Sequence, residues 1–379
     1  MQPDWIPSFI PNEHNAYSIN WNAVFDVFPV LRELEAVPQD PAFHSEGDVL
    51  THTGMVMEHL TSDEAWRRLD AVARCEVWLA ALLHDVGKLR TTEVLSDGSV
   101  RSPKHSYVGE RVVRELLYKS VDISIPFASR ERIVRYIRYH GLPLWFMEKE
   151  NQKKAIVIPS QMINMHHLYL VASADVYGRI SDDRENLIDK VELFKTYCEE
   201  LHCLTGPYQF PDSYSRFLYA RNSQRDSNYQ AYDDTWGVVT LMSGLPGAGK
   251  DTWIEAHTPG FEVISLDTIR NELGISPDEK QGTVIQTAKQ KARELLRAKI
   301  PFIWNSTNIS RSLRQSLIEL FHNYNAKTKI VYIECNYTEL VDRNKEREKA
   351  VPTKILDKLI KKLEVPDSTE AVEVVYYSK

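Results

Sequence analysis

The stretch GLPGAGKDT, from Gly244 to Thr252, combines a glycine-rich loop with a lysine, which is a pattern that binds phosphate groups. Gly247 and Gly249, like Gly244, allow backbone N–H groups to turn toward an anion, and the start of a following helix adds positive potential. The apolar run GVVTLMS directly before it is the strand that such a loop requires. Lys250 is therefore predicted to reach the β and γ phosphates of a nucleotide.

Asp251 occupies the position at which phosphate-binding loops normally carry a serine or threonine that holds magnesium. An aspartate could hold hydrated magnesium through water, because magnesium keeps several of its waters. It could instead only cap the helix N-terminus, where a carboxylate is favourable. The sequence leaves both interpretations open, and Thr252 remains available for a phosphate oxygen.

A second apolar run ends in SLDTIR and places Asp267 and Arg270 one helical turn apart. Transfer of a phosphoryl group to a hydroxyl needs a carboxylate that accepts the proton and a cation that fixes the acceptor. We therefore predict Asp267 as the catalytic base and Arg270 as the acceptor clamp. Polar residues at the end of a third run are expected at the same crevice, with two arginines behind them. These residues are Asn305, Ser306, Thr307, Asn308, Arg311 and Arg314.

The stretch DRNKEREKAVP places Arg343 and Arg347 one turn apart before Val351 and Pro352. This pattern indicates a lid near residues 341–352 whose two arginines close over the transferred phosphoryl group. A solvated run of charges is the alternative interpretation.

Another set of residues, in the first half of the chain, has the types that bind divalent transition metals. The set consists of His52, His84, Asp85, His105, His140 and Asp175. If Asp85 bridged two ions about 3.5–4 Å apart, these ions could activate water and steady the leaving oxygen in phosphoester hydrolysis.

The elements that must position these residues differ between the two halves of the chain. Residues 21–204 show apolar positions at helical spacing, and Gly206-Pro207 ends the last of these helices. From Trp236 onward, short apolar runs alternate with helical patterns, which favours a parallel sheet covered by helices. The predicted fold is multidomain: an all-α domain (1–205), a connector (206–235) and an α/β domain (236–379).

Composition is that of an ordinary globular chain, with 379 residues of which 43% are hydrophobic and 26% charged. The four cysteines form no CxxC pair, which favours a reducing compartment. No signal peptide and no apolar stretch of about 20 residues is found, so we expect a cytoplasmic protein without a membrane span. A net charge of −7 argues against passive coating of nucleic acid, but not against an enzyme that grips one strand end.

The C-terminal motifs together resemble the 5′-hydroxyl polynucleotide kinase branch of the P-loop kinases, over nearly all of 236–363. The resemblance rests on GxPGxGK, S-x-D-x-x-R, N-S-T-N and R-N-x-x-R…VP. It implies that ATP or another NTP, with Mg²⁺, phosphorylates the 5′-hydroxyl of an RNA or DNA end. Asp251 departs from the pattern of that family.

The order H…HD…H…H…D with its HDxxK context resembles the HD phosphohydrolase superfamily, from about residue 48 to 179. The resemblance implies one or two divalent transition metals (Mn, Ni, Co, Zn or Fe). It implies that Lys88 contacts a substrate phosphate, and Arg179 is a second candidate for that role. It implies the following ligands: His52, His84, Asp85 and Asp175 for a first ion, and His105 and His140 for a second.

The two halves in this order resemble the bacterial bifunctional HD–polynucleotide kinase family, which implies RNA end healing. The HD site would open a 2′,3′-cyclic phosphate and remove the resulting 2′-phosphate, the kinase would phosphorylate the 5′-hydroxyl, and a separate RNA ligase would seal the ends. One alternative is a small-molecule kinase fused to an HD nucleotidase. Another is a nucleotide-gated RNA-binding module with one degenerate site. The preference between RNA and DNA, and the existence of a homodimer, stay open.

Overall fold

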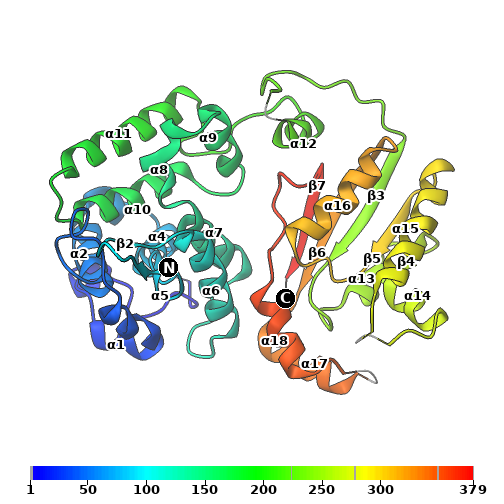
Figure 1. The fold of residues 1–379 in the computed structure, drawn as a ribbon, viewed down its shortest axis with the longest axis horizontal. Coiled ribbons are helices and arrows are strands. Elements are labelled where there is room, and N and C mark those ends of the chain that lie inside the picture. Colours follow the sequence, from blue (N-terminus) through cyan, green and yellow to red (C-terminus); the bar gives the residue numbers. More distant parts are fainter. Residues whose placement is uncertain (1–2, 223, 277–278, 348–349, 379) are drawn as a thin grey trace. The chain divides into compact units, whose positions relative to one another are not determined.

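The computed structural model describes residues 3–222, 224–276, 279–347 and 350–378. The chain divides into two compact units, Met1–Gln209 and Phe210–Lys379, and each is described by itself. Figure 1 shows that the first unit is built of helices and the second around a sheet. None of the helices in the described ranges is long and apolar enough to cross a membrane.

The first unit is helical, as the sequence predicts, apart from the two-residue strands β1 (Glu93–Val94) and β2 (Val100–Arg101). Its α-helices are α1 (Trp21–Val27), α2 (Val49–Ser62), α3 (Glu64–Arg67), α4 (Ala71–Leu83), α5 (Lys88–Thr91), α6 (His105–Lys119), α7 (Phe127–Tyr139), α8 (Leu142–Trp145), α9 (Gln152–Ser160), α10 (Met165–Tyr177) and α11 (Arg184–Glu200). Three 3₁₀ helices, η1 (Glu13–Asn15), η2 (Pro29–Ala36) and η3 (Phe146–Glu148), complete the described part of this unit.

Helix α10 contacts α2, α4, α7 and α11, and α4 also packs on α7. The apolar character of α4 and α10 explains this central position, because ten of the residues of α4 and nine of those of α10 are buried. Side-chain caps fix where the central helices begin: the Asp48 carboxylate accepts from Thr51 N at 2.8 Å, and Asp70 and Asn164 cap α4 and α10 in the same way.

Gly87 allows the turn after α4 to lie directly against the first turn of α6. A Cβ atom at this position would lie 2.0 Å from the carbonyl oxygen of His105, a distance that real Cβ atoms do not adopt. Only glycine therefore permits this approach, which brings the adjacent residues His84 and Asp85 close to His105.

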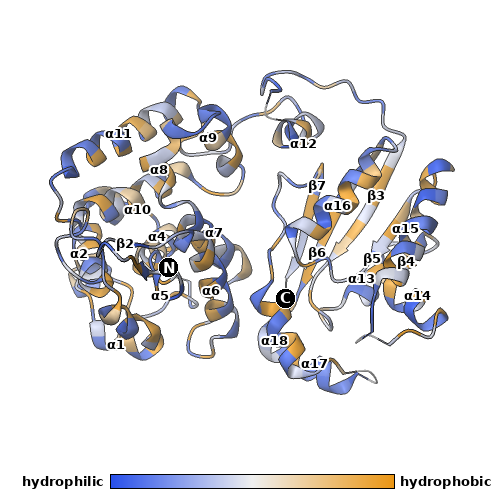
Figure 2. Ribbon diagram, in the orientation of Figure 1, coloured by the Kyte–Doolittle hydropathy of each residue, from blue (hydrophilic) through white to orange (hydrophobic). Residues whose placement is uncertain are grey.

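The second unit contains a five-stranded sheet in the order β4-β5-β3-β6-β7, in which every neighbouring pair is parallel. The strands are β3 (Gly237–Ser243), β4 (Glu262–Ser265), β5 (Phe302–Asn305), β6 (Ala326–Glu334) and β7 (Glu373–Ser378). Its helices are α12 (Ser213–Arg221), α13 (Lys250–His257), α14 (Leu266–Glu272), α15 (Gly282–Arg297), α16 (Arg311–His322), α17 (Tyr337–Glu346) and α18 (Thr353–Lys361). Figure 2 shows hydrophobic residues along the central strands, whereas α17 is largely hydrophilic.

The segment 206–235, predicted as a connector, is largely part of the second unit. Tyr214 and Phe217 on α12, together with Ala231, are buried in one core cluster with Val239 and Phe302 of the sheet. Two aromatic residues of this segment, Tyr214 and Phe217, therefore belong to the hydrophobic core of the second unit. The boundary between the compact units lies at Gln209 and Phe210.

Candidate metal centre and candidate nucleotide site

The structure brings all six predicted metal ligands together within the first unit. His52 lies on α2, Asp175 lies on α10, and His84 and Asp85 directly follow α4. His105 begins α6, and His140 directly follows α7. Five of the six are buried, and only His105 is partly exposed, with 28% of its side chain accessible.

Four of these residues form a first group of donor atoms. His52 Nε2 lies 3.0 Å from Asp175 Oδ1, and His84 Nε2 lies 4.0 Å from the same oxygen. His84 Nε2 and Asp85 Oδ1 are buried without a hydrogen-bond partner among the described residues. Buried polar atoms are normally paired, because leaving one unsatisfied costs about 1–3 kcal/mol. An imidazole nitrogen and a carboxylate oxygen left in this state fit a divalent metal.

Asp85 connects the first group to a second one. Its Oδ2 lies 3.2 Å from His84 Nε2, and its Oδ1 lies 3.5 Å from His105 Nε2. His105 Nε2 and His140 Nε2 face each other at 3.1 Å. The Asp85 carboxylate can therefore contribute one oxygen to each group, as the sequence-based hypothesis of a bridging residue requires.

Backbone contacts fix the tautomers of three of the imidazoles. The Nδ1 atoms of His84, His105 and His140 lie 2.7, 2.9 and 2.8 Å from the carbonyl oxygens of Ala81, Ser102 and Ile137. Nδ1 must carry the proton to donate there, so Nε2 keeps its lone pair, which is the form that binds metals. Two such lone pairs facing each other between His105 and His140 require a cation between them, which supports the fit to a metal.

The charge states of the cluster also suit metal binding. Burial, with the neighbouring His105 and His84, lowers the pKa of His140 to about 3, so that its imidazole stays neutral. Burial alone would raise the pKa of Asp85, but His84 and Lys88 outweigh it and hold that pKa well below the usual range. His140 is therefore available as a neutral imidazole, and Asp85 as an ionised carboxylate.

The two cations proposed to contact phosphate are both paired to ligand carboxylates. Lys88 Nζ lies 2.8 Å from Asp85 Oδ2 and donates to Gln39 Oε1 at 2.7 Å. Arg179 donates to both oxygens of Asp175, at 3.1 and 2.6 Å. Both therefore hold the ligand carboxylates in place, and a phosphate contact by either one stays a prediction.

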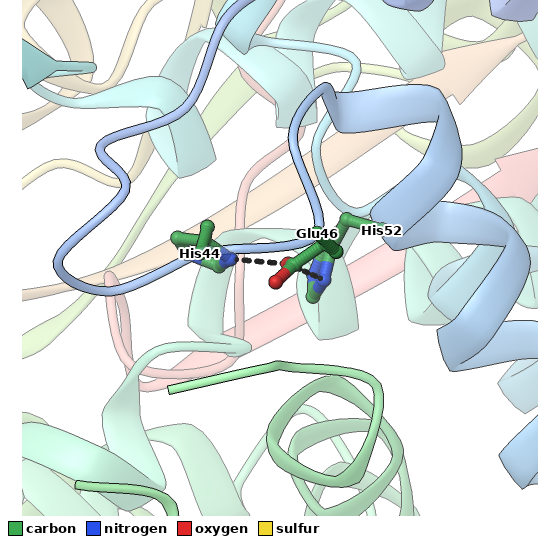
Figure 3. Close-up of side chains that lie close together, drawn as sticks. All are labelled: His44, Glu46 and His52. Atoms are coloured by element: carbon green, nitrogen blue, oxygen red, sulfur yellow. Dashed lines mark hydrogen bonds and ion pairs between the residues drawn. The ribbon is translucent and has the colours of Figure 1, made fainter. Parts of the chain in front are cut away.

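Sequence reasoning missed Glu46 and His44, which lie beside the first group (Figure 3). One oxygen of Glu46, Oε1, lies 2.8 Å from His44 Nδ1 and 2.9 Å from His52 Nδ1. The other oxygen accepts from the backbone N–H of Ile180 at 3.0 Å. Gly47 and the capping Asp48 separate Glu46 from the helix that carries His52, so no helical spacing links them in the sequence.

Glu46 is expected to orient the His52 ring, since it faces Nδ1 while Nε2 points at the metal ligands. Glu46→Gln should weaken Mn²⁺ or Co²⁺ binding roughly 10–100-fold, the usual cost of losing such an outer partner. Isothermal titration with the metal and the visible spectrum of the Co²⁺-loaded protein measure this effect. Glu58→Gln, at an exposed position of the same helix, is the matched control. Equal metal affinity in both variants would contradict this role.

The predicted phosphate-binding loop connects β3 to α13. Gly244, Gly247 and Gly249 have φ values of 147°, 84° and 103°, which other residues adopt only with strain. At Gly244, a Cβ atom would also lie 2.4 Å from the carbonyl oxygen of Ile333 on β6. Lys250 Nζ donates to the carbonyl oxygens of Gly244 and Leu245, both at 2.9 Å. The lysine therefore points back over the loop that would hold the phosphates.

Burial lowers the pKa of Lys250 to about 8, although Asp251 and Asp267 favour its charged form. Phosphates bind the ammonium form, so the affinity for ATP should be constant below pH 8 and fall as the pH rises from 8 toward 10. The affinity for ATP can fall by at most about tenfold per pH unit. Titration of ATP at several pH values measures this slope, which Lys250→Arg should abolish because guanidinium stays charged. A flat profile in the parent protein would contradict the assignment.

Asp251 lies in the first turn of α13, whose N-cap residue is Gly249. Its Oδ1 accepts from Asn305 Nδ2, at the end of β5, at 2.6 Å. Both residues line one cavity together with Lys250. Asp251 is therefore placed where it can meet a hydrated ion through water, and that role stays a prediction.

The predicted base and clamp contact each other on α14. Arg270 Nη1 is paired with Asp267 Oδ1, and Arg270 Nε donates to Gln281 Oε1 at 2.8 Å. The Asp267 side chain is 74% exposed, so an acceptor hydroxyl can reach it. Both residues line the cavity that contains Lys250, which has a volume of about 1960 Å³.

Both predicted lid arginines also line this cavity. Arg343, on α17, donates to the Ala248 carbonyl of the loop at 3.4 Å and pairs with Glu339, while Arg347 directly follows α17. Asn344 exchanges two hydrogen bonds with Val351, at 2.8 and 3.0 Å, which ties the two ends of the segment together. Residues 348 and 349 of the predicted lid lie outside the described residues.

Arg311 and Arg314, which follow the third strand in the sequence, are not among the residues that line the cavity. Arg314 is fully buried and donates two hydrogen bonds of 2.8 Å to Glu370, and Arg311 pairs with Asp367 at 2.6 Å. They anchor the segment that leads into β7. The preceding polar residues do line the cavity, as the sequence predicts; these are Asn305, Ser306, Thr307 and Asn308.

Comparison with known families matches both units. The family described as an HD domain matches residues 49–159, and the family described as an AAA domain matches residues 239–366. Together with the helical ligand cluster and the phosphate-binding loop, these matches decide the architecture. The chain joins an HD domain to a P-loop kinase-like domain. It is accordingly an enzyme with a hydrolase-type and a kinase-type unit.

Curated relatives match parts of this HD–P-loop protein. The chain is 33% identical over 118 residues to the Multifunctional CCA protein of Halorhodospira halophila, which covers 31% of this chain and 25% of that protein. It is 21% identical over 141 residues to the L-seryl-tRNA(Sec) kinase of Methanococcus maripaludis, covering 35% of this chain and 55% of that kinase. The chain thus spans about a quarter of the first relative and about half of the second.

Among solved structures, the HD–P-loop protein is similar to a gluconokinase from Sinorhizobium meliloti, with 18% identity and a TM-score of 0.28. That match covers 38% of this chain and 83% of the gluconokinase. A sugar kinase from Janibacter sp. HTCC2649 matches with 17% identity and a TM-score of 0.29, over 38% of this chain and 85% of that one. Likeness of this degree carries no conclusion about the substrate.

Proposed function

We propose that the protein heals RNA ends: its P-loop unit phosphorylates 5′-hydroxyl ends with an NTP, and its HD unit opens 2′,3′-cyclic phosphates and removes the 2′-phosphate. The observation that carries the proposal is the exposed Asp267 in a cavity shared with Lys250. At about 1960 Å³, this cavity has room for the donor nucleotide and for the end of a strand beside it.

In the kinase unit, the residues divide into those that bind the donor and those that act on the acceptor. Lys250 and the loop N–H groups bind the phosphates, and Arg343 and Arg347 neutralise charge on the transferred group. Asp267 accepts the proton of the 5′-hydroxyl, and Arg270 positions the strand end. Magnesium, when bound, would neutralise further phosphate charge, with Asp251 and Asn305 as its neighbours.

In the HD unit, the six-residue ligand set would hold one or two divalent transition metals, which supply activation of water and charge neutralisation. His84, His105 and His140 keep their Nε2 lone pairs available because their Nδ1 protons are held by backbone carbonyls. Lys88 and Arg179 hold the ligand carboxylates, and on substrate binding they are close enough to the cluster to meet a phosphate.

The two curated relatives support this proposal through their names alone. One is by name a kinase of seryl-tRNA, so its substrate carries RNA, and the other is by name a CCA protein. A separate RNA ligase would be the partner that seals the healed ends. We propose RNA over DNA as the substrate.

The acceptor class is tested by comparing phosphate transfer from labelled ATP to a 5′-hydroxyl RNA oligonucleotide, a DNA oligonucleotide of the same sequence, and free nucleosides. We expect kcat/KM to be highest for RNA and to fall at least about 100-fold for nucleosides, since these lack the neighbouring phosphates. Higher kcat/KM for nucleosides than for oligonucleotides would establish a small-molecule kinase instead.

A further inference from the structure

Three aromatic side chains form a cluster at one end of the cavity of the P-loop unit. Trp253 and His257 lie one turn apart on α13, and their rings stack at 4.7 Å with an interplanar angle of 9°. Tyr377 of β7 approaches both, with ring centroids at 5.5 and 5.6 Å. All three residues line the cavity that contains Lys250. We call Trp253, His257 and Tyr377 the aromatic cluster.

The aromatic cluster has unused hydrogen-bonding capacity. Trp253 Nε1 is buried and has no hydrogen-bond partner among the described residues. His257 Nδ1 lies 2.9 Å from the Trp253 carbonyl oxygen, so it donates there and leaves Nε2 as an acceptor. A planar ligand with its own polar edge would fit such a surface.

The strand order determines which part of the nucleotide points toward the aromatic cluster. Asp267 closely follows β4, at one edge of the sheet, and Tyr377 lies on β7, at the opposite edge. The phosphate-binding loop follows β3, between these edges. The γ-phosphate must face Asp267 for transfer, so the nucleoside must extend the other way. It therefore extends toward β7.

The register of β6 and β7 places Tyr377 close to the loop. Tyr377 pairs with Ile333, and the carbonyl oxygen of Ile333 is the atom that lies against Gly244 at the loop's first residue. Trp253, in turn, lies three residues after Lys250 on α13. The aromatic cluster is thus adjacent to the phosphate cradle on the donor side.

We propose that the aromatic cluster binds the nucleobase of the NTP donor by stacking and by a hydrogen bond to His257 Nε2. This inference rests on the proposed kinase function and adds the residues that select the donor. Stacking strength grows with the area of the base, so purine nucleotides should bind more tightly than pyrimidine nucleotides.

Titration calorimetry with ATP and with inorganic tripolyphosphate separates base binding from phosphate binding in the full chain. Trp253→Ala and Tyr377→Ala should each weaken ATP binding roughly tenfold, as expected for loss of one stacking partner. Both should leave tripolyphosphate affinity unchanged, and Trp253→Phe should restore most of the ATP affinity. Tyr232→Ala, at a tyrosine that is 83% exposed and lies outside the residues that line this cavity, is the control.

Two results would overturn the nucleobase site while leaving the proposed kinase intact. One is unchanged ATP affinity in both alanine variants. The other is an equal loss for ATP and tripolyphosphate, which would mean that the cluster only supports the fold of the loop. If the parent chain bound neither ligand, the proposed kinase function itself would fail, and the inference with it. Tyr377→Ala keeps the test decisive if Trp253→Ala does not fold, because Tyr377 is 39% exposed.

Discussion

Replacing Asp85 with asparagine should abolish hydrolysis by the HD unit and leave the rate of 5′ phosphorylation unchanged. Its two oxygens face His84 and His105 separately, at 3.2 and 3.5 Å, so one substitution affects both groups of donors. Metal affinity should fall by more than the roughly 100-fold that loss of an outer partner can cost. Metal content after dialysis and hydrolysis of a 2′,3′-cyclic phosphate RNA are the two measurements.

The matched control for this prediction is Asp189→Asn, at an exposed position of α11 in the same unit. Circular dichroism of both variants checks that the helical unit still folds, because Asp85 is buried and paired with Lys88. A variant Asp85→Asn that kept its metal and hydrolysed the cyclic phosphate at the parent rate would refute the metal centre assigned to this cluster.

The second large effect concerns Asp267 in the P-loop unit. Asp267→Asn should lower kcat for 5′ phosphorylation about 10²–10⁴-fold, the usual contribution of a general base, with little change in KM for ATP. Asparagine can still accept from Arg270, so the clamp keeps its position while the proton acceptor is lost. Initial rates with a 5′-hydroxyl RNA and saturating ATP measure the effect.

Glu255→Gln is the control for this substitution, because Glu255 is exposed and lies on α13 of the same unit. Hydrolysis by the HD unit serves as an internal control and should be equal in both variants. A kcat for Asp267→Asn within a factor of about two of the parent would show that another group accepts the proton.

The sequence predicts that these six residues lie together because their order and the HDxxK context resemble the HD superfamily. His84 and Asp85 are adjacent and follow an apolar helix, and His52 falls at a buried position of α2. Glu46 escaped prediction because its contact with His52 depends on how a loop folds back onto Ile180. Nothing in residue type or spacing marks such a long-range contact.

Prediction from the sequence has the same limits in the second unit. The loop, the acceptor pair and the lid arginines were predicted from motifs, and the structure places them around one cavity. The fifth strand, β7, and the role of Arg314 were missed, because a buried pair between Arg314 and Glu370 has no local signature. The same holds for Tyr377, whose position depends on the register between β6 and β7.

Both proposed activities can be tested on one RNA oligonucleotide with a 5′-hydroxyl at one end and a 2′,3′-cyclic phosphate at the other. It is incubated with the full chain, ATP, Mg²⁺ and Mn²⁺, and both ends of the product are identified by mass spectrometry. We expect gain of a 5′-phosphate and conversion of the cyclic phosphate to free hydroxyls, with Asp85→Asn and Asp267→Asn each removing one change. An RNA that keeps both original ends, while free nucleosides are phosphorylated under the same conditions, would contradict the proposed function.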